Sequence, residues 1–155
     1  MKRVILAGLL GVLFTTAAHA ESSSFSRLMA LGQSVQCSFA KPDGSQSGTI
    51  YVSAGKLRGD MQVREGNTTY PMYMIRDAQK MYTWGGPMGE NQGMIMPIGM
   101  GRSPMGGPQT ANMDEEMDFT CQSWSADAGK FEPPSDVQFQ DMAQLMGAYA
   151  AAAGQ

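Results

Sequence analysis

Apolar and polar side chains alternate along much of residues 35–84, in short segments separated by turn residues. Alternation with a period of two is typical of strands that bury one face, and very short connections join antiparallel neighbours. Four such segments follow one another directly, at residues 49–53, 56–64, 68–76 and 80–84. They predict an antiparallel meander. Because Pro71 cannot donate to a strand ladder, it predicts a sheet edge or a bulge at its position.

The rest of the chain adds shorter elements of both kinds. Residues 21–32 have a helical pattern that ends at Gly32, in which residues 22–24, all serine, offer an N-cap before the apolar positions from Phe25 onwards. Asp141 precedes a second helical pattern. Further alternating segments lie at residues 35–39, 93–96, 117–124 and 137–139. We therefore expect a mainly β (α+β) fold in one domain, residues 21–149, with about seven strands, a short N-terminal helix and a C-terminal helix. Residues 150–155 are expected to fray.

The first twenty residues have the organisation of a secretory signal peptide. Lys2 and Arg3 precede an apolar run, which ends in the small-x-small cleavage pattern Ala18-His19-Ala20. The run is too short to cross a bilayer as an anchor. We expect an exported protein, periplasmic or secreted, that is not an integral membrane protein.

Cleavage after Ala20 would change the chemistry that is available to the protein. The loss of Lys2 and Arg3 takes the formal charge from −3 to −5, which argues against binding to nucleic acid. His19 is the only histidine, so Ser-His-Asp and Cys-His catalysis and His-containing zinc sites are excluded after cleavage. No nucleotide-binding or metalloprotease motif is present. The sequence predicts a protein that is not an enzyme and has no cofactor.

Cys37 and Cys121 form an even pair in a chain that is expected to be exported. A structural disulfide is the main interpretation of such a pair. A metal-binding thiol pair and a redox dithiol are alternatives, although the spacing does not match the Cys-x-x-Cys pattern of redox dithiols.

Residues 87–113 differ in composition from the rest of the chain, with six Met, six Gly and four Pro. Loops of this length that lack their own secondary structure are usually either functional or disordered. This Met/Gly/Pro-rich loop is therefore a candidate functional segment.

Two short patterns resemble the periplasmic lipoprotein-carrier (LolA/LolB-like) superfamily. Residues 48–52, Gly-Thr-Ile-Tyr-Val, with Gly55-Lys56-Leu57-Arg58 are similar to the first hairpin of that family. Ile75-Arg76-Asp77 followed by Lys80-Met81-Tyr82-Thr83-Trp84 is similar to a later pair of strands. The C-terminal pattern Cys121-Gln122-Ser123-Trp124 also resembles uncharacterised exported domains that have a Cys-x-x-Trp motif.

The carrier resemblance implies a curved antiparallel half-barrel, with helices closing its concave side and an apolar ligand bound there. It also implies that Arg58, on the second strand of the meander, helps to hold a lid. Gly59 stands where the carriers usually have an aromatic residue, and the cysteine pair and the Met-rich loop are not part of the carrier pattern.

The leading functional hypothesis is non-catalytic binding of an apolar or lipid-like ligand on the concave face of the sheet. Methionine suits such a surface because its flexible side chain adapts to ligands of different shape, although it also fills irregular cores. The candidate ligand-binding residues are Arg58, Met61, Met72, Met74 and Trp84.

Two alternatives use the Met/Gly/Pro-rich loop. Thioethers are soft ligands that select Cu(I), and residues two apart on a strand share a face. The candidate copper ligands are Met88, Met94, Met96, Met100 and Met105. In the other alternative, the loop at residues 87–113 is the contact surface for a partner protein.

Overall fold

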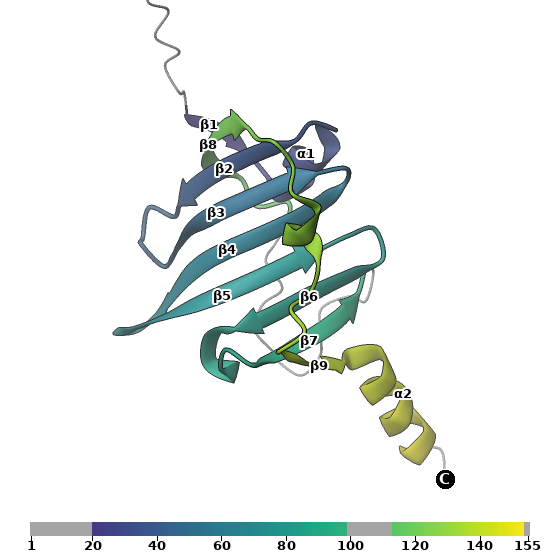
Figure 1. The fold of residues 1–155 in the computed structure, drawn as a ribbon. Helices are drawn as coiled ribbons and strands as arrows, with labels where there is room; N and C mark the ends of the chain where they lie inside the picture. The colour runs from purple at the N-terminus through teal and green to yellow at the C-terminus, as the bar shows by residue number, and fades with distance from the viewer. Residues whose placement is uncertain (1–19, 99–112, 154–155) are drawn as a thin grey trace, which may run out of the picture.

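The computed structural model describes residues 20–98 and 113–153. These residues form one open, curved sheet of nine strands with two α-helices (Figure 1). The expected mainly β fold, with an antiparallel meander and a helix near each end, is therefore confirmed.

The strands lie in the order β1-β8-β2-β3-β4-β5-β6-β7-β9 across the sheet. Neighbours pair antiparallel except β7 and β9, which are parallel. The strands are β1 (Ala20–Ser23), β2 (Val35–Ala40), β3 (Gln46–Ser53), β4 (Lys56–Glu65), β5 (Thr68–Arg76), β6 (Lys80–Gly85), β7 (Gln92–Pro97), β8 (Met117–Ser123) and β9 (Gln138–Asp141). The helices are α1 (Phe25–Ala30), α2 (Met142–Ala153) and two 3₁₀ turns, η1 (Gly86–Met88) and η2 (Ala128–Phe131).

The central meander β3–β6 has the tight turns that its sequence predicts. Between β3 and β4, Ala54 has φ 50° and Gly55 has φ 74°, so both turn residues are left-handed. Two left-handed residues in succession match the twist of a hairpin, and glycine adopts this conformation without strain. The turn therefore sets the pairing of β3 with β4 from Ser53↔Lys56 onwards.

The N-terminal part of the chain differs from the sequence prediction. The helix itself begins at Phe25, and Ser24, within the expected cap at residues 22–24, accepts a hydrogen bond from Arg27 N at 3.3 Å. The residues before Ser24 form β1 and pair with β8. The sheet has nine strands instead of about seven; β1 is the unexpected one, whereas β9 corresponds to the alternating segment at residues 137–139.

Two local expectations have a mixed outcome. Pro71 lies in a central strand rather than an edge strand, but β6 pairs with β5 only from Met72↔Gly85 onwards. The Pro71 ring thus lies just beyond the end of the β6 ladder, where no donor is needed. Asp141 caps α2 as predicted, accepting from Ala143 N at 2.9 Å, but the helix continues past Ala150 to Ala153.

The hydrophobic core lies on the face of the sheet that α1 covers, which we call the α1 face. Phe25 of α1 packs against Phe39 and Phe119, with ring centroids 5.9 and 5.6 Å apart. The core continues across the sheet through Ile50, Leu57 and other buried side chains of β2–β6. The apolar positions of the alternating strands lie on this face, as the sequence predicts.

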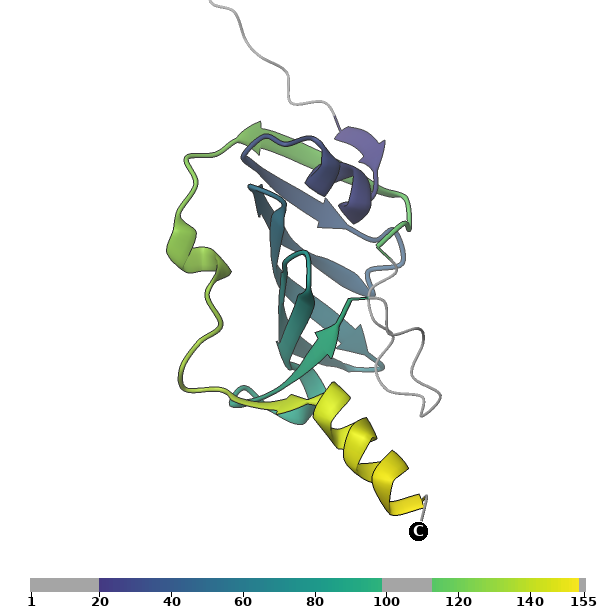
Figure 2. The same ribbon diagram turned by 90° about the vertical axis from the view of Figure 1, so that its right-hand side faces the viewer.

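A long connection crosses the opposite face of the sheet. We call residues 124–137 the strap, because they run from β8, the neighbour of the edge strand β1, to β9 at the opposite edge (Figure 2). The strap includes η2, whose Phe131 is buried. We call the face beneath it the strap face.

The predicted disulfide between Cys37 and Cys121 is confirmed. The two residues stand directly opposite each other on β2 and β8. Among the residues that the model describes, no helix has the length and apolar character needed to cross a membrane.

Candidate ligand-binding surface

Methionines gather on the α1 face of β4–β7. In the strand register, Met61 stands opposite Met72, Met81 stands opposite Met96, and Thr83 stands between Met74 and Met94. Residues that are directly opposite share a face of the sheet. We call this surface the methionine face; it comprises Met61, Met72, Met74, Met81, Met94 and Met96.

The six methionines differ in exposure. Met61, Met74 and Met81 are 3%, 1% and 7% exposed and belong to the core. The other three, Met72, Met94 and Met96, are half-buried. Within the described ranges, α1 lies over β8, β2 and β3 on the α1 face, and α2 projects away from the sheet (Figure 2). The half-buried methionines therefore form an apolar surface that adjoins the core, with neither helix over it.

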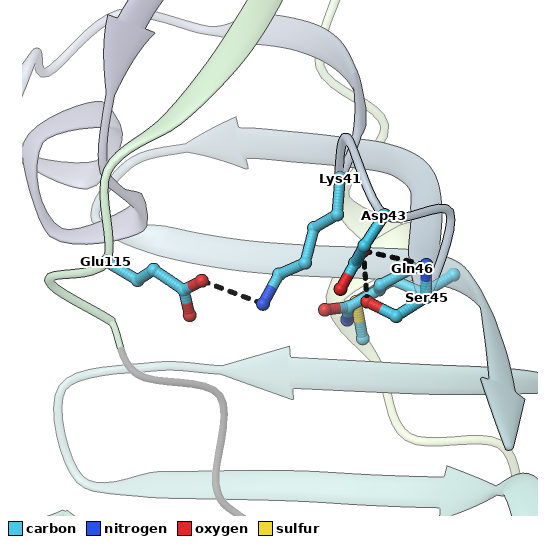
Figure 3. A network of polar contacts seen from close by, with 6 residues as sticks. Lys41, Asp43, Ser45, Gln46 and Glu115 are labelled. Atoms are coloured by element: carbon cyan, nitrogen blue, oxygen red, sulfur yellow. Dashed lines mark hydrogen bonds and ion pairs between the residues drawn. The ribbon is translucent and has the colours of Figure 1, made fainter.

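Two sulfur atoms of this side of the sheet accept hydrogen bonds. Gln46 Nε2 donates to Met61 Sδ at 3.1 Å, next to the turn that Asp43 and Ser45 stabilise (Figure 3). Arg76 Nη1 donates to Met29 Sδ at 3.5 Å, from β5 to α1. These polar contacts help to hold the buried Met61 and the partly buried Met29 in place.

The five ligand-binding residues predicted from the sequence do not form one site. Met61, Met72 and Met74 lie together on the methionine face. Arg58 and Trp84 lie on the strap face, because Arg58 is one residue away from Leu57, and Trp84 stands opposite Tyr73. Alternation along a strand sends adjacent residues to opposite faces, so a single surface cannot include both groups.

Arg58 lies at the centre of a cluster on the strap face. Its guanidinium carbon is 4.8 Å from the ring centroid of Trp84 and 5.5 Å from that of Tyr73. Arg58 Nε donates to Asp60 Oδ1 at 2.5 Å, and Nη1 donates to the carbonyl oxygen of Lys130 at 3.5 Å. Arg58 thus connects the sheet to the strap, and its side chain is only 16% exposed.

Further aromatic residues attach the two ends of the strap to the sheet. Near β8, Tyr51 packs on Trp124 at 5.1 Å, and Lys130 Nζ lies 4.2 Å from the Tyr51 ring centroid. Near β9, Phe139 contacts Trp84 and Tyr82. The sequence analysis did not predict these contacts with the strap; the only signal was the aromatic spacing on alternate strand positions. These aromatic and cation–π contacts lie between the sheet and the strap.

The predicted copper ligands separate in the structure. Met94 and Met96 share the methionine face, as their spacing predicts. Met88 lies in η1, between β6 and β7. Met100 and Met105 lie outside the described residues, as does most of the loop at residues 87–113. Over the ranges described, no group of three or more His, Cys, Asp or Glu side chains could hold a metal ion.

Two hollows lined by several charged residues lie around α1 and the segment before β8. One is about 300 Å³ and is crossed by the exposed ion pair of Arg27 and Glu116 at 3.1 Å. The second, about 390 Å³, is lined by Lys41, whose Nζ contacts Glu115 Oε1 at 2.7 Å (Figure 3). In the same hollow, hydrogen bonds from the Ser45 hydroxyl and N–H lower the pKa of Asp43. Exposed ion pairs of this kind contribute little stability.

No protein-family model, curated protein or solved structure matches this chain. Over residues 20–98 and 113–153, neither helix lies over the half-buried methionines of the methionine face.

Proposed function

We propose that this is an exported, non-catalytic binding protein that takes an apolar or lipid-like ligand on the methionine face. The observation that carries the proposal is the position of Met72, Met94 and Met96, which are half-buried on one face, with Met72 and Met96 packed against the core. Burial of apolar surface contributes about 25 cal/mol per Å², so a ligand lying across these side chains would gain affinity. Flexible thioethers allow the surface to fit ligands of different shape.

The proposal is tested with N-phenyl-1-naphthylamine, an uncharged apolar dye whose fluorescence rises in an apolar site. We expect the purified chain to bind the dye, and the double variant Met72→Asp/Met94→Asp to bind it at least tenfold more weakly. Tyr149→Asp is the matched control, because Tyr149 is a 68% exposed apolar side chain on α2, away from this face. Circular dichroism establishes that each variant is folded. Equal dye binding by the double variant and the control would contradict the proposal.

Cu(I) binding is a second candidate, favoured by the pairing of Met81 with Met96 on neighbouring strands and by Met94 two residues earlier. Directly opposite side chains have Cβ atoms about 5 Å apart, within reach of a shared ion. Titration against a Cu(I) chelator should show a site that is lost in Met81→Leu/Met94→Leu/Met96→Leu. Met88→Leu, on η1, is the control, and unchanged affinity in the triple variant would exclude this site.

A further inference from the structure

The sulfur atoms of the methionine face and its surroundings differ in their access to an oxidant. Met61 is buried and its sulfur accepts a hydrogen bond from Gln46, and Met74 is 1% exposed. Met72, Met94 and Met96 are half-buried. Oxidation of a thioether begins when a sulfur lone pair attacks the oxidant, so burial and a hydrogen bond to the sulfur both slow it. Within the methionine face, the side chains that would contact a ligand are therefore more accessible to an oxidant than the buried ones.

We propose that the methionine face is an oxidation-controlled binding surface, on which peroxide converts Met72, Met94 and Met96 to sulfoxides and so releases the apolar ligand. This inference rests on the function proposed above. In each reaction the thioether sulfur attacks one oxygen of hydrogen peroxide, an S–O bond forms and the O–O bond breaks. The sulfur loses two electrons, and the departing oxygen takes a proton and leaves as water.

The position of the three residues explains why their oxidation would matter. Met72 stands opposite the buried Met61, Met96 stands opposite the buried Met81, and Met94 is next to Thr83. A sulfoxide is polar, and a ligand that covered it without a hydrogen bond would lose affinity. Three such groups within one small surface affect any ligand that lies across it. We expect dye binding to weaken at least tenfold.

The experiment treats the full chain with hydrogen peroxide and follows dye binding together with sulfoxide at each methionine by peptide mass spectrometry. Sulfoxide should form at Met72, Met94 and Met96 before Met61 and Met74. Met146, which is 45% exposed on α2, reports that the oxidant was active. Methionine sulfoxide reductases should restore dye binding, because they reverse the modification.

A variant that cannot be oxidised at these three positions separates this proposal from oxidative damage elsewhere in the protein. Met72→Leu/Met94→Leu/Met96→Leu keeps an apolar surface of similar volume, so it should bind the dye both before and after peroxide. Met146→Leu is the matched control. After peroxide treatment it should lose dye binding as the wild type does.

The outcomes distinguish the two proposals. If the reduced wild type does not bind the dye, both proposals fail. If it binds the dye and retains full affinity with sulfoxide at all three positions, only the oxidation control is overturned. Equal oxidation rates at Met61 and Met72, or unfolding on oxidation seen by circular dichroism, would also overturn it.

Discussion

Arg58 is the residue that most clearly joins two parts of this fold. It stacks on Trp84, pairs with Asp60 and donates to the strap carbonyl of Lys130. A planar guanidinium suits this position, because it can stack on a ring and donate at its edge at the same time. Its role in the structure is to hold the strap against the sheet.

Replacing Arg58 by alanine should lower the free energy of unfolding by about 2–3 kcal/mol, since a partly buried cation–π contact and charge-assisted hydrogen bonds are lost. Lys56→Ala, at an exposed position on the same strand, should change it by less than about 0.5 kcal/mol. Urea unfolding of both variants measures the difference. A loss no larger than that of Lys56→Ala would show that the strap is held by its aromatic contacts instead.

Asp77 stabilises the turn between β5 and β6 through its carboxylate. Its Oδ1 accepts from Gln79 N and Lys80 N, each at 2.7 Å. Burial acts to raise the pKa of Asp77, but the two backbone hydrogen bonds, with Lys56 and Lys80 nearby, outweigh it and lower the pKa from 3.8. A lowered pKa means that the folded state favours the charged carboxylate.

The contribution of Asp77 to stability should therefore be complete above its unfolded pKa of 3.8 and disappear as pH falls through the lower pKa of the folded state. Asp77→Asn keeps an oxygen acceptor but does not titrate, so its stability should fall less steeply below pH 4 than that of the wild type. Urea unfolding between pH 7 and pH 3 gives both slopes. Parallel slopes would mean that Asp77 is not linked to folding.

At the scale of elements, α2 is unusual because its twelve residues include no charged side chain and it projects from the sheet (Figures 1 and 2). Leu145, Met146 and Tyr149 are 41%, 45% and 68% exposed. Isolated helices of about this length are marginal in water. The helix is held mainly at its start, where Asp141 caps it and β9 joins the sheet.

We expect backbone amides in the second half of α2 to exchange with deuterium much faster than those of β4 and β5. Asp141→Ala should destabilise the helix by about 1 kcal/mol and speed exchange in its first half as well, whereas Asp141→Asn should retain the cap. Hydrogen exchange with mass spectrometry checks both statements. Strong protection throughout α2 would contradict this prediction.

At the scale of the whole molecule, the chain returns to its starting edge when β8 inserts between β1 and β2. The disulfide joins these distant parts of the chain, since its cysteines have a sequence separation of 84. Cys37 is fully buried, but Cys121 lies at an exposed position. The bridge thus anchors β8, from which the strap begins.

Removing the bridge with Cys37→Ala/Cys121→Ala should cost about 4–5 kcal/mol, since closure of a long loop no longer restricts the unfolded chain. Denaturant unfolding measures the loss. Dithiothreitol should destabilise the wild type but leave the double variant unchanged. A loss below about 1 kcal/mol would show that β2 and β8 pair equally well without the bridge.

The sequence by itself determined the meander, the disulfide and the sharing of one face by Met72 and Met74. These features depend on local alternation, on turn residues such as Gly55 and on the chemistry of paired cysteines. It also predicted Asp141 as a helix cap, which needs only neighbouring residues.

Only the tertiary structure decided what covers each face of the sheet. Alternation places Arg58 and Met61 on opposite faces, but the strap that covers Arg58 has no periodic pattern to reveal its path. The same holds for β1, whose partner β8 lies about a hundred residues further along the chain. Contacts between distant segments depend on the shapes and surfaces that meet after folding, and local propensities do not specify them.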